Sequence, residues 1–297
     1  MARPILVTGA AGQVGRALLR HRHDNSQPLI ALSRRDLDIR DVTRTHETIE
    51  RVAPGAVINA AAYTAVDEAE RESELAYAIN RDGTGNLARA CAAFAIPLLH
   101  ISTDYVFDGA KAGAYLETDV AAPLGVYGAS KLAGEEMLRH DLEQHVILRT
   151  SWVFSAHRTN FVKTIVKLAA DRSELRVVSD QRGCPTSADA IASALLAITA
   201  RIRQGHADWG TYHFCGTPAT NWWEFASAIV DAAAARLGKR IPITPISTAD
   251  YPTAARRPMN SVMNCGKIAA AFGLSQPDWR QSLPRVVAEI FEEGATE

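Results

Sequence analysis

The sequence predicts an α/β fold: a Rossmann-type, doubly wound parallel sheet with a smaller α/β lobe on the C-terminal side. Short apolar segments alternate with helical segments through the first half of the chain, and a glycine-rich turn leads from the first apolar segment into the first helix. After about residue 155 the alternation loosens and Gly and Pro become denser. We therefore expect one domain at residues 1–155 and a smaller lobe at residues 156–297, with an approximate boundary across which the two can interleave.

The 297-residue chain has 47% apolar and 22% charged residues, as is typical of a soluble globular protein. Its 32 basic and 33 acidic residues give a net charge of −1, which excludes a strongly basic nucleic-acid-binding protein. No apolar run approaches the roughly 18 residues of a membrane span, and the N-terminus shows no secretory signal. The four cysteines are scattered. We therefore expect a cytoplasmic protein with reduced thiols and no structural metal.

Five continuous apolar segments predict strands that are buried on both faces, as in a parallel sheet. The predicted strands are residues 4–8, 28–33, 56–59, 97–103 and 145–154. Helical patterns lie between them, and right-handed crossovers place such helices on both faces of the sheet. The predicted helices of the first half are residues 14–21, 41–52, 75–94 and 127–140.

The second half predicts a smaller lobe that packs over the carboxyl edge of the sheet. Frequent Gly and Pro residues separate short elements there. The predicted helices are residues 161–170, 188–203, 222–237 and 283–293, and the predicted strands are residues 176–178, 211–214 and 241–246.

Three glycines, Gly9, Gly12 and Gly15, follow the first strand and open the first helix. Glycines at this spacing allow a tight turn, a close approach of the backbone to a pyrophosphate, and close packing of the helix on the strand. The N-terminus of that helix also offers free N–H groups and a positive dipole end to phosphate. The position of this turn predicts that the 1–155 domain binds NAD(P), which leaves the later lobe for a substrate.

The second predicted strand ends in Ser33, Arg34 and Arg35, at the place where NAD-dependent enzymes carry an acidic residue. A small hydroxyl followed by two arginines suits the 2′-phosphate of NADPH. Solvated arginines would give the same pattern, and Asp36 and Asp38 leave NADH open as the cofactor. We favour NADPH and expect Asp38 to lie near the adenine.

Tyr127 and Lys131 lie four residues apart in the predicted helix before the fifth strand, so their side chains share one face. An ammonium group beside a phenol stabilises the phenolate and makes the phenol a stronger acid near neutral pH. Ser102 and Thr103 end the fourth strand, at the edge of the sheet where doubly wound folds bind ligands. This combination predicts a catalytic group of Tyr127, Lys131 and one of the two hydroxyls.

Seven stretches of the chain resemble the extended short-chain dehydrogenase/reductase family, and within it the reductases of dTDP-4-keto-6-deoxy sugars. They are residues 9–15, 59–70, 102–109, 123–135, 149–154, 180–186 and 255–258. The resemblance implies an NADPH-dependent reduction of the C4 keto group of dTDP-4-dehydro-6-deoxy-L-mannose. The product would be dTDP-L-rhamnose, for the synthesis of cell-surface polysaccharide.

The same resemblance implies roles for individual residues. Tyr127 matches the proton donor, Lys131 its partner, and Thr103 the catalytic hydroxyl, with Ser102 as the second candidate. The matching cofactor contacts are Gly12, Gln13 and Val14 at the pyrophosphate, Asp38 and Ile39 at the adenosine, and Ala62, Tyr63 and Thr64 along the cofactor. The expected substrate contacts are Thr103, Asp104, Tyr105 and Trp152, with Gln181, Thr186, Arg256 and Arg257 as candidates at the nucleotide end.

One departure from the family concerns a metal ion. Some members bind Mg²⁺ between subunits through three acidic side chains, whose positions here are Ala17, Asp189 and Glu289. Because only two of the three are acidic, we do not expect a tight Mg²⁺ site. A homodimer stays open without it.

Two other functions stay open. A nucleotide-sugar epimerase or 4,6-dehydratase of the same family recycles a tightly held NAD. The dehydratases follow the catalytic threonine with Asp-Glu, whereas here Tyr105 follows Asp104. A non-catalytic NADP-binding regulatory subunit would keep the same binding site, although the intact Thr103, Tyr127 and Lys131 weigh against it.

Overall fold

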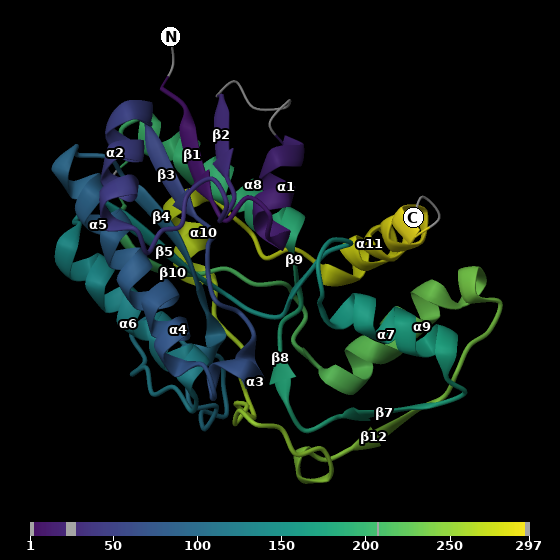
Figure 1. Ribbon diagram of the computed structural model, residues 1–297. Coiled ribbons are helices and arrows are strands. Elements are labelled where there is room, and N and C mark those ends of the chain that lie inside the picture. Colours follow the sequence, from purple (N-terminus) through teal and green to yellow (C-terminus); the bar gives the residue numbers. More distant parts are fainter. Residues whose placement is uncertain (1–2, 22–27, 207, 295–297) are drawn as a thin grey trace.

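A six-stranded parallel sheet forms the centre of the protein (Figure 1). The computed structural model describes residues 3–21, 28–206 and 208–294. All neighbouring strands of the sheet run parallel, which confirms the predicted fold class. In spatial order the strands are β10 (Gly210–His213), β5 (His145–Thr150), β4 (Leu98–Thr103), β3 (Ala56–Asn59), β1 (Ile5–Thr8) and β2 (Leu29–Leu32).

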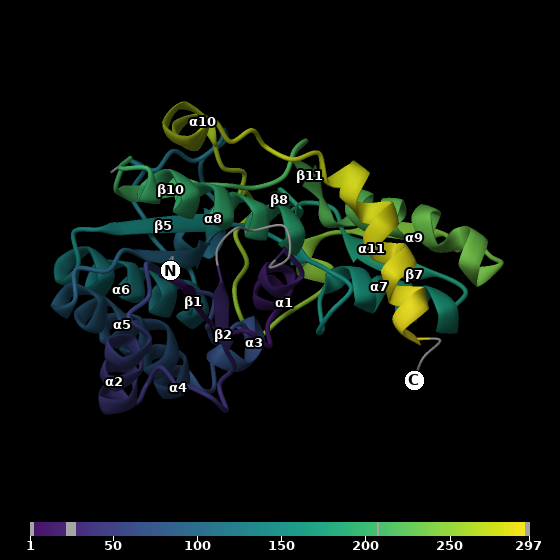
Figure 2. The ribbon, with the colours of Figure 1, turned by 90° about the horizontal axis from the view of Figure 1, so that it is seen from above.

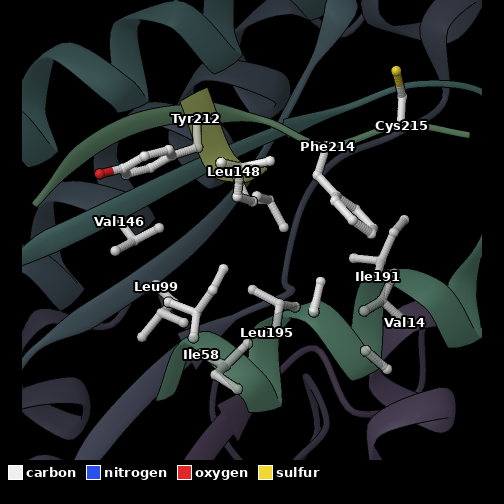
Figure 3. Close-up of a cluster of buried hydrophobic side chains, with 14 of the residues drawn as sticks. Val14, Ile58, Leu99, Val146, Leu148, Ile191, Leu195, Tyr212, Phe214 and Cys215 are labelled. Atoms are coloured by element: carbon white, nitrogen blue, oxygen red, sulfur yellow. The ribbon is translucent and has the colours of Figure 1, made fainter. Parts of the chain in front are cut away.

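Helices cover both faces of this sheet because its strands are apolar on both sides. Successive side chains of a strand face opposite ways, so Ile5 and Val7 pack in one core cluster and Leu6 in another. Figure 3 shows part of the first cluster. No helix within the described ranges is both long and apolar enough to cross a membrane. The helices are α1 (Gln13–Arg20), α8 (Ala188–Arg203) and α10 (Gly266–Phe272) on the first face, and α2 (Val42–Val52), α5 (Gly83–Ala93) and α6 (Val126–Asp141) on the other.

A second body, with its own apolar core, lies beside the sheet (Figures 1 and 2). Phe154, Phe225 and Trp279 meet in this core. The chain also returns to the large sheet, since β10 lies beside β5. A division of the chain at residue 155 therefore stays a prediction. The elements of the second body are α7 (Phe161–Asp171), α9 (Trp222–Leu237), α11 (Trp279–Gly294), and the parallel strands β7 (Leu175–Val178) and β12 (Ile243–Ile246).

The continuous helix predicted at residues 75–94 is instead α4 (Ser73–Tyr77), a π-helical turn at Ala78–Asp82, and α5. Asn80 lies at the centre of the π turn and is fully buried. Its side-chain amide binds the backbone N–H and carbonyl of Tyr63 and the hydroxyl of Ser130. Wide turns of this kind are frequent at functional sites. Here the π turn brings the side chain of Asn80 to the loop at Tyr63. Helical periodicity in the sequence does not indicate this contact.

The strand predicted at residues 145–154 is wrong in its second half. β5 ends at Thr150, and Trp152 has a φ of +47°, a left-handed conformation that breaks the strand. The chain then resumes as β6 (Val153–Phe154), which pairs with β9 (Thr186–Ser187). Several short elements were not predicted from the sequence: the helices α3 (Val66–Ala69) and α10, the strand β9, and the antiparallel pair of β8 (Arg182–Gly183) with β11 (Thr220–Asn221).

Gly134 tests how closely α6 must approach the π turn. Ala is about 1 kcal/mol better than Gly inside a helix. However, a Cβ at Gly134 would lie 2.1 Å from the carbonyl oxygen of Asn80, and overpacking of this kind costs about 1–3 kcal/mol or more. We expect Gly134→Ala to lower the free energy of unfolding in urea by about 1–2 kcal/mol. Gly113→Ala is the control, because its Cβ would meet nothing within 4 Å. Equal stability of the two variants would contradict the expectation.

Candidate active site

The glycine turn forms a cradle that only glycine fits. Gly9 has a φ of +73°, and a Cβ there would lie 2.5 Å from the backbone of Ala60. A Cβ at Gly15 would lie 2.4 Å from the carbonyl oxygen of Gly9. The turn is thus pressed against the end of β3, and the N-terminus of α1 lies at the carboxyl edge of the sheet. Gly12 begins α1 without a capping side chain, which suits the binding of an anion by the backbone.

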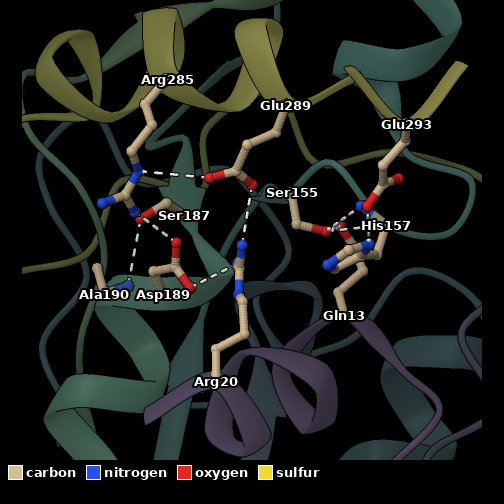
Figure 4. Close-up of polar contacts among 10 residues, drawn as sticks. All are labelled: Gln13, Arg20, Ser155, His157, Ser187, Asp189, Ala190, Arg285, Glu289 and Glu293. Atoms are coloured by element: carbon tan, nitrogen blue, oxygen red, sulfur yellow. Dashed lines mark hydrogen bonds and ion pairs between the residues drawn. The ribbon is translucent and has the colours of Figure 1, made fainter. Parts of the chain in front are cut away.

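Gln13 and Val14 differ in how their side chains are used. The side chain of Val14 is buried in the core. The carboxamide oxygen of Gln13 accepts a hydrogen bond from the hydroxyl of Ser155 at 2.8 Å (Figure 4). Since both side chains are occupied, their contribution to an anion site comes from their backbone N–H groups.

The segment after β2 carries two acidic and several basic side chains, and both acidic side chains have partners. Asp36 accepts hydrogen bonds from the backbone N–H and hydroxyl of Ser33. Asp38 forms a bidentate ion pair with Arg40, whose hydrogen bond is the main cause that lowers the pKa of Asp38 to about 2. Arg34 is two-thirds exposed and lies 3.6 Å from Asp38. This ion pair is longer than that of Arg40 with Asp38, and most of the Arg34 side chain faces solvent.

A basic cavity of about 480 Å³ lies next to this segment. Three arginines line it, of which the sequence analysis singled out only Arg35. The other two, Arg44 and Arg51, are seven residues apart in α2 and therefore lie on the same face of that helix. This spacing is the sequence signal that could have identified them. The lining residues are Leu32, Arg35, Asp36, Arg44, Glu47, Thr48 and Arg51.

The loop of Ala62, Tyr63 and Thr64 follows β3 and lies over the π turn. Asn80 holds its backbone, as described above, and the hydroxyl of Tyr63 donates a hydrogen bond to Glu72 at 2.8 Å. Ile39 is buried, and a Cβ at Gly83 would overlap its side chain. Hydrogen bonds therefore fix the loop after β3, and packing against Gly83 fixes Ile39 in the segment after β2.

Thr103, Asp104, Tyr105 and Tyr127 meet where β4 ends. The Thr103 hydroxyl donates to the Asp104 carboxylate at 3.0 Å and accepts from the backbone N–H of Tyr105 at 3.1 Å. The rings of Tyr105 and Tyr127 meet edge to face at 5.7 Å. These contacts bring together three of the four predicted substrate contacts and the predicted proton donor.

Burial raises the pKa of all three acidic groups of this cluster, Asp104, Tyr105 and Tyr127. It raises the pKa of Asp104, which is 2% exposed, to about 6. It also raises the pKa of Tyr127 to about 12, against a hydrogen bond with Thr103 that lowers it, and the charge of Asp104 raises it further. These groups are therefore more readily protonated than in water. The free protein thus does not show the lowered Tyr127 pKa that the sequence led us to expect from the pairing with Lys131, because burial outweighs it.

Ser102 and Thr103 face opposite sides of β4 because side chains alternate along a strand. The Thr103 hydroxyl interacts with Tyr127, whereas Ser102 lies on the side of Glu135. Of the two hydroxyls left open by the sequence, Thr103 is the one near the tyrosine.

Lys131 lies one turn after Tyr127 on α6 and is 2% exposed. Its amine donates to the carbonyl oxygen of Ile101 at 2.7 Å and lies 3.1 Å from Nε2 of His100. Burial lowers the pKa of Lys131 to about 8, against the charge of Glu135, which raises it. His100 was not predicted as a site residue, since its only signal in the sequence is a polar residue inside an apolar strand.

The acidic residues before α6 position other elements. The carboxylate of Glu70 accepts from the backbone N–H of Val126 at 2.8 Å and so caps α6. Asp67 binds Arg257 and the backbone N–H of Ala255, which ties α3 to the segment between β12 and α10. Arg257 is thus occupied, whereas Arg256 is exposed.

Trp152 lies in an aromatic stack at the boundary of the two bodies. Its ring is parallel to that of Trp222, with centroids 3.5 Å apart, and Gly183 lies directly against it. Gln181 accepts from the indole N–H of Trp222 and donates to Thr248. Gln181 therefore supports the stack, and Thr186 is fully buried.

The three positions considered for Mg²⁺ do not fit a metal ion. Ala17 is buried, and Asp189 and Glu289 are bound by arginines (Figure 4). Arg20 reaches Asp189 at 2.7 Å and Glu289 at 2.9 Å, and Arg285 binds Asp189 from the other side. Among the described residues, no group of three His, Cys, Asp or Glu side chains is arranged to hold a metal ion. The cluster instead ties α1, α8 and α11 together.

Comparison with known proteins finds one family along nearly the whole chain. Residues 2–291 match the family described as RmlD substrate binding domain. A dTDP-4-dehydrorhamnose reductase of Aggregatibacter actinomycetemcomitans is 45% identical over 292 residues, which cover 97% of this chain and 99% of the relative.

Solved structures agree with this match. The dTDP-4-dehydrorhamnose reductase of Bacillus anthracis in complex with NADP superimposes with a TM-score of 0.90 at 33% identity, covering 97% of this chain and all of that one. A UDP-glucose 4-epimerase of Brucella ovis superimposes with a TM-score of 0.81 at 19% identity, over 97% of this chain and 98% of that one. At that identity the likeness concerns the fold alone.

Asp104 makes the stability of the fold depend on pH. Because its folded pKa is raised to about 6, its contribution to stability is full below about pH 4 and is lost as the pH rises through about 6. Asn cannot ionise, so the free energy of unfolding of Asp104→Asn should rise relative to that of the wild type by on the order of 1–3 kcal/mol from pH 4 to pH 8. Urea unfolding at both pH values measures this difference.

A matched control for this prediction is Asp108→Asn. Hydrogen bonds from Ala110 and Tyr115 lower the pKa of Asp108, so this variant should lose stability relative to the wild type as the pH rises. A difference between Asp104→Asn and the wild type that is the same at both pH values would refute the role of burial.

Proposed function

The chain belongs to the family of dTDP-4-dehydrorhamnose reductases that share the RmlD substrate binding domain, and on that premise we propose the reaction of this protein. It reduces the C4 keto group of dTDP-4-dehydro-6-deoxy-L-mannose with NADPH and forms dTDP-L-rhamnose. The observation that carries this proposal is the meeting of Thr103 and Tyr127 above the buried Lys131, beside the glycine cradle. A keto sugar bound there would have an acid at its oxygen and a dinucleotide site next to it.

Tyr127 is the proton donor in this proposal. Its raised pKa keeps the phenol protonated over the physiological range, so the proton is available when negative charge develops on the keto oxygen. The Thr103 hydroxyl, which donates to Asp104 in the free protein, is the second donor within reach of that oxygen.

Lys131 stabilises the phenolate that remains after the proton has left. Its side chain shares a face of α6 with Tyr127, and its burial strengthens the attraction between an ammonium and a phenolate. A pKa of about 8 means that the ammonium form is populated at neutral pH.

The residues of the first domain suit a phosphorylated dinucleotide. We assign the pyrophosphate to the backbone N–H groups at the start of α1, and the 2′-phosphate to Ser33 and Arg34 beside the arginine-lined cavity. The NADP bound by the Bacillus anthracis reductase supports this assignment. When bound, the reduced nicotinamide supplies a hydride; the protein orients the reactants and polarises the ketone.

Asp104, Tyr105 and Trp152 are the proposed substrate contacts. The indole of Trp152 offers an aromatic face to a sugar or a base, with Trp222 stacked behind it. Tyr105 stands where a 4,6-dehydratase would carry its second acid, which favours reduction over dehydration.

We also propose that the reaction takes place in the cytoplasm. All four cysteines are unpaired thiols, as expected in a reducing compartment. A homodimer stays a prediction.

Tyr127→Phe removes the proton donor and leaves the ring in place. We expect kcat for NADPH oxidation with the keto sugar to fall by about 10²–10⁴-fold, with little change in NADPH binding. Tyr212→Phe is the control, because its hydroxyl binds only the carbonyl oxygen of Asp208 among the described residues. Near-normal turnover of Tyr127→Phe would exclude the assigned role. A wild type that binds NADPH but oxidises none with this sugar would point to another keto sugar or to a regulatory subunit.

Arg34→Ala tests the preference for NADPH. Loss of one arginine–phosphate contact should raise KM for NADPH about tenfold, while KM for NADH stays within about twofold. Arg240→Ala is a matched control, since the Arg240 side chain is 66% exposed against 67% for Arg34 and lies in the second body. Equal changes for both cofactors would show that Arg34 does not bind the 2′-phosphate.

A further inference from the structure

The proposed proton donor lies in the first turn of a helix, which is the part of a helix that opens most readily. α6 begins at Val126, so Tyr127 is its second residue. The first N–H groups of a helix have no acceptor within it, and helix ends fray for that reason. In α6 the first hydrogen bond within the helix is donated by Ala129 to the carbonyl oxygen of Gly125. Tyr127 therefore depends on contacts from outside α6 for its position.

The residue before α6 has no capping group, and Glu70 supplies one from another segment. Gly125 stands at the N-cap position and has no side chain that could accept a hydrogen bond. The Oε1 atom of Glu70 instead accepts from the backbone N–H of Val126 at 2.8 Å. A carboxylate at this place also meets the positive end of the helix dipole. This cap joins the neighbour of Tyr127 to a residue that lies 56 positions before it in the chain.

The place of the Glu70 carboxylate depends on the glycine at position 125. The backbone of Gly125 is extended, with a φ of −144° and a ψ of 173°, so alanine fits there without backbone strain. A Cβ would lie 2.6 Å from Oε1 of Glu70, whereas the Cβ of Ala255 would be 4.0 Å away. An alanine would therefore displace the end of one flexible side chain and little else. Glycine leaves the space that the cap needs.

Glu70 follows a short helix that is itself anchored. α3 ends at Ala69, which is fully buried. Asp67 in the same helix accepts from the backbone N–H of Ala255 at 3.0 Å and pairs with Arg257 at 2.8 Å. The segment that carries Glu70 is thus fixed independently of α6, so the cap restrains the helix rather than following it.

Other contacts restrain α6 further along its length. The side-chain amide of Asn80 donates to the hydroxyl of Ser130 at 2.9 Å, and that hydroxyl donates to the carbonyl oxygen of Tyr127 at 2.9 Å. These contacts act on the second turn of the helix. Among the described residues, Glu70 alone accepts from the N–H of Val126.

We propose that Glu70 is a positioning residue for the reaction: its carboxylate holds the first turn of α6 so that Tyr127 keeps its place at the reacting ketone. The proposal rests on the function proposed above for Tyr127. Loss of the cap lets the first turn fray, and the phenol then spends less time within reach of the keto oxygen. Because a misplacement of about 1 Å can lower a rate by about 10²-fold, the effect falls on kcat. Binding of NADPH, which is assigned to the glycine cradle, stays as it is.

Hydrogen exchange of the Val126 N–H is the first readout, and it needs no activity. In the full-length protein labelled with ¹⁵N at valine, loss of one signal in Val126→Ile assigns this group. We expect it to exchange about tenfold faster in Glu70→Ala than in the wild type, because it has lost its acceptor. Glu68→Ala is the matched control, since Glu68 lies in the same segment and pairs with Arg71 on the surface. An unchanged rate in Glu70→Ala, or an equal change in the control, overturns the proposal.

A double-mutant cycle on turnover is the second readout. Glu70→Ala and Gly125→Ala should each lower kcat for NADPH oxidation with the keto sugar about tenfold, while Kd for NADPH stays within about twofold. Because both changes remove the same hydrogen bond, the double variant should be no slower than Glu70→Ala. Glu70→Gln keeps an acceptor oxygen and should stay within about threefold of the wild type. Glu68→Ala should keep the wild-type kcat.

Additive losses in the double variant overturn the proposal, as does a Glu70→Gln variant that is as slow as Glu70→Ala. A rise in Kd for NADPH that matches the loss of rate does the same, since it would indicate a general disturbance of the fold. If Glu70→Ala does not fold, exchange and turnover of Gly125→Ala decide, and wild-type values of both overturn the proposal. Failure of the wild type to oxidise NADPH with the keto sugar would instead overturn the proposed function and leave the exchange test intact.

Discussion

The close approach of α6 to the carboxyl edge of the sheet is the constraint on which the site depends. A Cβ at Gly128 would lie 2.1 Å from the carbonyl oxygen of Tyr105, and a Cβ at Gly134 equally close to that of Asn80. Glycine at both positions lets the helix backbone touch the segments beneath it. Because of this contact, Tyr127 meets Thr103 and the amine of Lys131 reaches the backbone of β4.

Burial at this contact shifts the pKa values of the tyrosine and the lysine in opposite directions, each toward a larger share of the neutral form. It raises the pKa of Tyr127 to about 12 and lowers that of Lys131 to about 8. Charge on either group is costly without the other, since a low-dielectric surrounding penalises single charges and strengthens paired ones. A negative charge that develops on the oxygen of a bound ketone would therefore be neutralised by proton transfer from Tyr127 rather than stabilised by solvent.

The second body is tied to the cofactor cradle at several points. Ser155 holds Gln13 in the glycine turn, and Arg20 on α1 binds carboxylates from both α8 and α11. Asp67 and Arg257 form a further tie, between α3 and the segment that follows β12. Exposed ion pairs add little stability singly. Together they hold the start of α1 and the stack at Trp152 in one arrangement, which a site between two bodies requires.

The sequence alone was sufficient for the order of the longer strands and helices, for the glycine turn and for the Tyr127–Lys131 pair. These depend on local properties: the backbone freedom of glycine, the period of a helix and the continuous apolarity of buried strands. Only the tertiary structure decided that β10 joins the sheet, that Trp152 breaks the fifth strand, and that Asn80 and His100 lie beneath the site. Each of these depends on packing between residues far apart in the chain, and a lone polar residue in an apolar segment does not reveal its partner.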